Sequence, residues 1–153
     1  MKKVLIVLGA VLLVLVLLAA ILIGLGSYTL RTSEGEAKSY VDRTVQSIVT
    51  DWNLKTLVAE AAPELMRVAP PEKLQPIFKA FSTRLGPLKQ YNGAIRQRYY
   101  VNLMPWNRFV TFSYIVDATF EKSPAKIRVG IIRRDGQWKL TDFFVVSDAL
   151  IPR

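Results

Sequence analysis

The apolar run from Val4 to Gly26 limits most strongly what this chain can fold into. It contains no charged side chain, Lys2 and Lys3 precede it, and a polar segment of mixed charge follows it. An α-helix rises about 1.5 Å per residue, so the run would reach about 34 Å, enough to cross a hydrocarbon core of about 30 Å. The sequence therefore predicts a transmembrane anchor at residues 4–26.

A cleavable secretory signal is the alternative explanation of the same run. Such signals also begin with basic residues, but their apolar stretch usually covers only about 7 to 15 residues. Gly24 and Gly26, just before Ser27, provide small residues at a candidate cleavage site. The length favours an uncleaved anchor, and cleavage remains the open alternative.

The chain contains neither cysteine nor histidine. Disulfides, thiolate metal ligands and every mechanism that uses imidazole are therefore excluded. The residues beyond the anchor have the size of one compact domain, which must be stabilised by packing alone and thus fits a bacterial envelope protein. No catalytic, metal or nucleotide motif stands out, so we expect no cofactor, no metal and no enzymatic activity.

The basic residues at the N-terminus predict the orientation. Lys2 and Lys3 lie in the short tail 1–3, whereas the charges that follow the anchor are mixed. By the positive-inside rule this tail is cytoplasmic. We expect a linker at 27–33 and a domain at 34–153 that is periplasmic or otherwise extracytoplasmic, in a single-pass protein of the bacterial inner (plasma) membrane.

The first part of this domain has helical periodicity. Apolar residues recur every three or four positions: Ala37, Tyr40, Val41, Val45, Ile48, Val49 and Trp52. Asp51 or Asn53 then caps a second helix, which ends around Pro63. A third helix begins after residues 70–71, both proline, and ends at Gly86.

After Gly93 the apolar period changes from about 3.6 to 2, and β-branched and aromatic residues predominate. The alternation predicts four strands, at residues 95–103, 109–121, 126–134 and 137–147. Asp135-Gly136 supplies the two positive-φ residues of a tight hairpin. The apolar parity of the last strand shifts around Thr141-Asp142, which predicts a β-bulge there.

Helices followed by an antiparallel meander predict an α+β domain, in which about three helices pack on one face of a curved four-stranded sheet. Four segments and one aromatic residue carry a further resemblance: Ala62-Pro63-Glu64-Leu65, Pro71-Glu72-Lys73-Leu74, Leu85-Gly86-Pro87-Leu88, and Arg134-Asp135-Gly136-Gln137-Trp138-Lys139-Leu140 leading to Phe143. Over residues 34–149 the chain resembles the nuclear-transport-factor-2-like (cystatin-like) superfamily, especially its small membrane-anchored bacterial envelope members. The resemblance implies a cone-like domain with Trp138 packed under the cone. Ketosteroid isomerases and limonene epoxide hydrolases of this superfamily place aspartates, tyrosines or histidines in the cone, but the resemblance transfers no such catalytic set to this chain.

Three residues are candidates for a cavity in such a cone. In a regular last strand, Asp142 would share a face with Trp138 and Leu140, where apolar surroundings raise a carboxyl pKa and allow general-base work. The predicted bulge would instead turn Asp142 toward solvent. Asp117 lies on the face of its strand opposite the apolar residues. Tyr114 lies on the apolar face, where a core role is the simpler interpretation.

Charge is unevenly distributed along the domain. Residues 65–110 contain eight basic residues and a single acidic one, Glu72. The candidates for a basic contact surface lie on the third predicted helix and on the first predicted strand: Lys73, Lys79, Arg84, Arg96 and Arg98. We expect Arg96 and Arg98 to share the polar face of that strand. Such a surface suits an acidic partner or anionic lipid headgroups, with a merely solvated face as the alternative.

Trp106 and Arg108, in the connection between the first two strands, are the remaining contact candidates. Tryptophan and arginine are enriched at interface hot spots. The alternative is that Trp106 folds back over the sheet. Nucleic acid is not expected as a partner, because the basic residues lack interleaved stacking aromatics in a known motif.

Two classes of function remain. The first is a noncatalytic binding or assembly module, held in the lipid bilayer through residues 4–26, which contacts another envelope or membrane protein; the resemblance to domains of type IV secretion inner-membrane components implies the same. The second is a small-ligand-binding protein or a histidine-free enzyme that uses the cone cavity. The two differ in whether aromatic side chains fill the cone or polar groups converge in an open one.

Overall fold

The computed structural model describes residues 1–152, except for the side chains of residue 5 and of residues 25–32. The chain divides into two compact units, Met1–Glu36 and Ala37–Arg153. The linker predicted at 27–33 lies within the bounds of the first helix, and its side chains up to residue 32 are outside the described residues. Each unit is described by itself.

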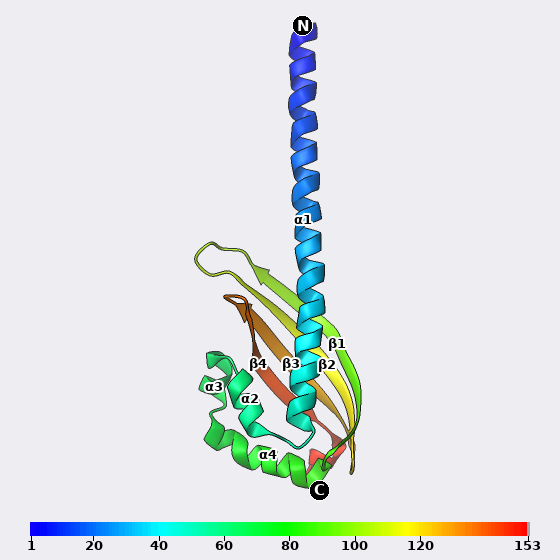
Figure 1. Ribbon diagram of the computed structural model, residues 1–153, viewed down its shortest axis with the longest axis vertical. Helices are drawn as coiled ribbons and strands as arrows, with labels where there is room; N and C mark the ends of the chain where they lie inside the picture. The colour runs from blue at the N-terminus through cyan, green and yellow to red at the C-terminus, as the bar shows by residue number, and fades with distance from the viewer. Residues whose placement is uncertain (153) are drawn as a thin grey trace. The chain divides into compact units, whose positions relative to one another are not determined.

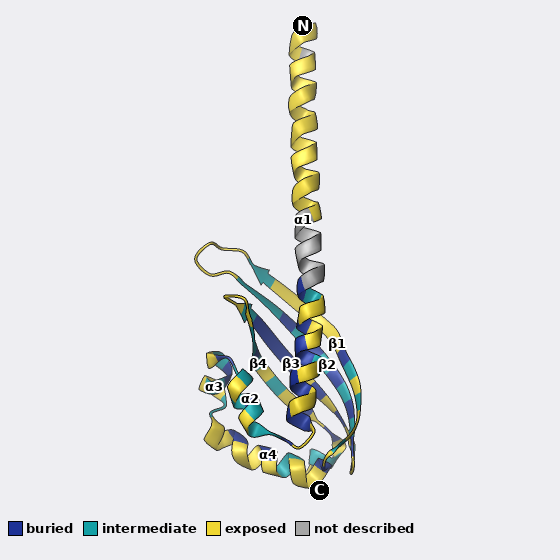
Figure 2. Ribbon diagram, viewed as in Figure 1, coloured by how far each residue is buried: buried dark blue, intermediate teal, exposed yellow. Residues whose placement is uncertain are grey.

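The first helix, α1 (Lys2–Val49), begins in the apolar run. Its part from Lys2 to Gly24 is long and apolar enough to cross a membrane. The described apolar side chains of this part are all exposed, as Figure 2 shows. A signal sequence near the N-terminus meets the same criterion, so the sequence and the helix together leave cleavage as the alternative.

The second unit combines the C-terminal part of α1 with further helices and one sheet (Figure 1). The helices are α2 (Leu54–Glu60), α3 (Pro63–Val68), α4 (Pro71–Leu85) and the 3-10 helix η1 (Asp148–Leu150). The strands are β1 (Leu88–Asn102), β2 (Phe109–Phe120), β3 (Pro124–Arg134) and β4 (Gln137–Val146). In the described part of the chain there are thus five helices and four strands, which confirms the α+β class.

Local sequence explains the helix ends. Asn53, and not Asp51, caps α2, since its side chain accepts a hydrogen bond of 3.2 Å from the Thr56 N–H. Pro63 does not end a helix but occupies the first turn of α3, where proline is tolerated. The sequence prediction missed α3 and η1 because such short helices show no apolar periodicity.

The strands form an open antiparallel sheet in the order β1-β2-β3-β4. Asp135 and Gly136 both have positive φ, 51° and 76°, and make the predicted tight hairpin between β3 and β4. β1 begins at Leu88, well before the predicted start at residue 95. Its register shifts twice before Ala94, and this interrupts the alternation that sequence analysis reads.

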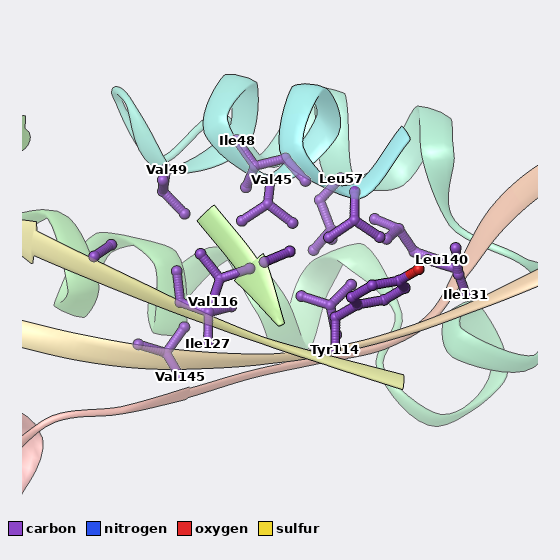
Figure 3. Close-up of a cluster of buried hydrophobic side chains, with 14 of the residues drawn as sticks. Val45, Ile48, Val49, Leu57, Tyr114, Val116, Ile127, Ile131, Leu140 and Val145 are labelled. Atoms are coloured by element: carbon purple, nitrogen blue, oxygen red, sulfur yellow. The ribbon is translucent and has the colours of Figure 1, made fainter. Parts of the chain in front are cut away.

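One face of the sheet, here called the inner face, carries the predicted apolar stripe of β2: Phe112, Tyr114, Val116, Ala118 and Phe120, all buried. The C-terminal part of α1 lies along this face, with Val45 and Ile48 directed toward it (Figure 3). Neither side chain is exposed at all. The core of the second unit therefore sits between this part of α1 and the sheet, with α2 and α4 completing the helical layer.

Candidate functional site

The inner face of the sheet is filled by side chains. Tyr114, a predicted cavity residue, is only 1% exposed and belongs to the hydrophobic core. Phe112 lies with its ring centroid 5.8 Å from that of Trp138 and 6.2 Å from that of Tyr114. Tyr40 of α1 stacks on Trp138 at 6.5 Å. These aromatic rings occupy the space in which a ligand chamber under the sheet would have to lie.

The two predicted cavity carboxylates lie on the opposite face, here called the outer face. In β4, Asp142 pairs with Gly130 and Leu140 pairs with Ile131, so Thr141 is an extra residue. This is the predicted bulge, and it turns Asp142 outward. Asp117 pairs with Lys126 and forms an ion pair of 3.2 Å with it. Tyr114, Asp117 and Asp142 therefore do not meet in one cavity.

Two carboxylates that the sequence analysis did not single out bind tyrosines, one buried and one partly buried. The Tyr91 hydroxyl donates to Asp42 at 2.8 Å, and the Tyr40 hydroxyl donates to Glu60 at 2.8 Å. The pKa of each tyrosine is raised, first by burial and then by the hydrogen bond to the carboxylate. Both phenols therefore stay protonated and act as hydrogen-bond donors near neutral pH.

Asp42 also holds β1 where its register shifts. Its Oδ1 atom accepts a second hydrogen bond, of 2.9 Å, from the Ala94 N–H, directly after a register shift of β1. Lys38, one turn earlier on α1, lies 2.6 Å from the same carboxylate. We call these contacts of Asp42 the Asp42 clamp. Its only signal in the sequence was the spacing of Lys38 and Asp42 on one side of a helix, which is common on solvated surfaces.

The outer face forms a regular grid of side chains, because residues that pair across the strands point the same way. One cross-strand row consists of Ile95, Ile115, Arg128 and Phe144, and the next consists of Arg98, Ser113, Gly130 and Asp142. Tyr100 and Val146 lie beyond these rows, and both are exposed. We call this set the outer sheet surface.

The centre of the outer sheet surface is hollow, because Gly130 has no side chain. The hollow has a volume of about 450 Å³, and Arg98, Arg128 and Asp142 contribute to its lining. A Cβ atom at Gly130 would lie only 2.5 Å from Asp142 Oδ2, so glycine is required for this arrangement. The Arg128 guanidinium lies 5.2 Å from the centroid of the Phe144 ring. Two arginines and exposed apolar groups thus surround a depression that can accept a protruding side chain.

The prediction that Arg96 and Arg98 share a face is wrong. Arg96 pairs with Tyr114 of the inner face, whereas Arg98 pairs with Ser113 of the outer face, because Gln97 is an extra residue of β1. Arg96 instead extends over the ring of Tyr99, 5.4 Å from its centroid. Of these two arginines, only Arg98 belongs to the outer sheet surface.

The basic residues of α4 lie on the other side of the sheet. Lys73, Lys79 and Arg84 are exposed, but α4 packs through Phe78 on Phe143 of the inner face, with ring centroids 6.1 Å apart. Arg84 donates to a main-chain carbonyl of η1 at 3.2 Å. The basic candidates therefore do not form one continuous surface with Arg98.

The connection between β1 and β2 projects its aromatic side chain into solvent. Trp106 is 82% exposed, so it does not fold back over the sheet. Arg108 is exposed as well, and it lines a shallow depression with Arg134 and Asp135 of the neighbouring hairpin. Both contact candidates of this connection are thus accessible.

A groove of about 1160 Å³ lies between α2 and α4. Its lining includes apolar side chains and two lysines: Trp52, Leu54, Val58, Phe78, Lys55 and Lys79. The sequence did not indicate it, because the groove arises from how two helices pack and not from a motif. Among the described residues, no group of three or more acidic side chains is placed to hold a metal ion.

A scan of the chain against models of known protein families finds no match, and a search of curated proteins finds none either.

Proposed function

We propose that this protein is a single-pass, membrane-anchored binding or assembly module without catalytic activity. Its outer sheet surface would contact another envelope or membrane protein. The observation that carries the proposal is the contrast between the two faces of the sheet. The inner face is filled by α1 and by aromatic rings, whereas the outer face exposes apolar and arginine side chains around a hollow.

The chemistry of this surface favours a protein partner. Phe144 is 55% exposed, and Ile95, Tyr100 and Val146 are exposed to a similar degree. Aromatic and arginine side chains carry much of the binding energy in protein interfaces. A partner with a polar side chain for the hollow lined by Arg98, Arg128 and Asp142, and apolar groups around it, would match both features.

The anchor determines where this partner is met. A helix from Lys2 to Gly24 that can cross a membrane, with two lysines at its N-terminal end, favours a cytoplasmic N-terminus and an extracytoplasmic second unit. This arrangement fits the bacterial inner membrane. Helices followed by a four-stranded meander also agree with the order of elements in the nuclear-transport-factor-2-like superfamily, and we propose a cone-like domain of that kind.

Affinity purification of the full-length protein from mild detergent tests the proposal. Phe144→Ser should strongly reduce recovery of the partner. Val68→Ser is the matched control, since Val68 is apolar and 78% exposed but lies on α3. Recovery of the same partner with Phe144→Ser, or with the anchor segment alone, would contradict the proposal.

The groove between α2 and α4 favours a second candidate function, the binding of a small ligand. Its volume lies slightly above the usual range of small-molecule sites, and its lining is largely apolar. Native mass spectrometry of the full-length protein would reveal a retained ligand. Val58→Trp should fill the groove and remove that ligand, whereas Phe144→Ser should leave it bound.

A further inference from the structure

The hairpin between β1 and β2 ends in a turn with large apolar side chains. We define the hairpin tip as residues 103–106. Leu103, Met104 and Trp106 are all more than half exposed. The Asn107 N–H donates to the Met104 carbonyl at 2.9 Å and closes the turn. The tip therefore presents its apolar side chains in a preformed arrangement.

The rest of the hairpin is basic and aromatic. Between Gly93 and Val116 it contains three arginines and no acidic residue. Tyr100, a few residues behind the tip, is exposed on β1. Tryptophan and tyrosine are enriched at the boundary between water and lipid, and arginine is attracted to anionic headgroups. An apolar tip backed by tyrosine and arginine is thus the composition expected of an interfacial membrane contact.

The hairpin projects from the end of the second unit at which the chain enters. The Leu88 N–H donates to the Thr50 carbonyl at 3.4 Å, and the Ala94 N–H donates to Asp42 at 2.9 Å. From Leu88 to Ala94, β1 therefore runs back along α1, from its C-terminal end toward Ala37. The tip continues in that direction.

The hairpin is also long. From Ala94 to Asn102, β1 extends about 26 Å at about 3.3 Å per residue. The tip therefore lies well away from the hydrogen bond between Ala94 and Asp42.

We propose that the hairpin tip is a second membrane contact, which inserts Leu103, Met104 and Trp106 among the headgroups of the bilayer that holds residues 4–26. This inference rests on the anchoring proposed above. A protein partner fits the tip less well, because a stable interface buries about 800 Å² on each side and a turn of four residues offers less. A bilayer requires only a few inserted side chains once an anchor holds the protein at its surface.

The absence of cysteine allows a clean test by single labelled cysteines. Full-length protein with Leu13→Cys, Met104→Cys or Val68→Cys would each carry an environment-sensitive dye, in liposomes of zwitterionic and anionic phospholipids. Lipids with a nitroxide near the headgroup or deep in the acyl chain would quench the dye according to its depth. We expect shallow quenching at position 104, deep quenching at position 13 and none at position 68. Adding Trp106→Ser should abolish the quenching at position 104.

The label at position 13 separates the two proposals. Quenching at position 13 without quenching at position 104 would overturn the inference and leave the anchor intact. No quenching at position 13 would overturn the anchor and the inference together. Equal quenching at positions 104 and 68 would show adsorption of the dye and overturn the inference. So would shielding of position 104 only after a protein partner is added, which would make the tip a protein-docking site.

Discussion

Ile48→Ala tests whether the inner face of the sheet is solidly packed, on which the noncatalytic assignment depends. Ile48 is completely buried and lies on the side of α1 that faces the sheet (Figure 3). If the inner face were an open ligand chamber, a smaller side chain would only enlarge it. If the face is filled, the substitution creates a cavity whose lining loses its contacts.

The expected cost follows from the burial. Truncation of a fully buried isoleucine to alanine destabilises a domain by about 2 to 5 kcal/mol, and we expect about 3 kcal/mol here. Ile77→Ala is the matched control, since Ile77 lies on α4 and is 45% exposed. It makes the same chemical change, and alanine has the higher helix propensity, so the control should change stability by less than about 1 kcal/mol.

Urea unfolding of the full-length protein in mild detergent measures both variants. The fluorescence of the buried Trp52 and the half-buried Trp138 reports on the second unit. We expect a lower midpoint with an unchanged slope for Ile48→Ala and almost no shift for Ile77→Ala. If Ile48→Ala lowers the free energy of unfolding as little as the control does, the inner face is not tightly packed. That result would favour a ligand chamber on this face.

Three further substitutions test individual contacts, each by its free energy of unfolding. Asp42→Ala removes the acceptor for the Tyr91 hydroxyl and for a main-chain N–H of β1, and should cost about 2 kcal/mol; an unchanged midpoint would refute the clamp. Trp52→Phe removes a hydrogen bond of 2.9 Å to the carbonyl that follows α4 and should also cost about 2 kcal/mol, measured by circular dichroism; full stability would contradict it. Glu64 accepts from its own main chain and pairs with Arg134, which holds the pKa of this carboxyl below its usual value of 4.5. A lowered pKa stabilises the fold above the unfolded value and loses this effect as pH falls through the folded value. Glu64→Gln should therefore cost about 0.5 kcal/mol at neutral pH, as expected for a half-exposed pair, and nothing in strong acid; a pH-independent cost would show that charge is not the cause.

The elements with a clear period were predictable from sequence. The alternation of β2 placed Phe112, Tyr114 and Phe120 on the buried face, and the structure agrees. Helix ends with a specific chemical signal, such as Gly86 after α4, were also placed correctly. The short helix α3 and the early part of β1 were not, because a helix of a single turn or two and a strand broken by bulges carry no readable period.

The outer sheet surface was predictable only in part, because it depends on two bulges: the one at Thr141-Asp142 was predicted from the parity shift, whereas the one at Gln97 was not. In a regular β1, Arg98 would share the inward parity of Arg96; in a regular β4, Asp142 would share the inward parity of Leu140. Both bulges flank the same cross-strand row through Ser113 and Gly130, and each turns a charged side chain to the outer face.

The same shift of parity turns an aromatic ring inward on each of the two edge strands. Tyr99 then meets Phe112 at 6.2 Å, and Phe143 meets Phe78 at 6.1 Å. A charge in the core would cost several kcal/mol, whereas an aromatic ring there adds buried apolar area. The packing of Phe143 thus explains the bulge of β4, which keeps Asp142 out of the core. Tyr99 stays 55% exposed, so the bulge of β1 turns Arg98 outward without burying the ring that takes its place. The hollow between Arg98 and Asp142 therefore combines two local irregularities on different strands, which is why the surface proposed for a partner has no local motif in the sequence.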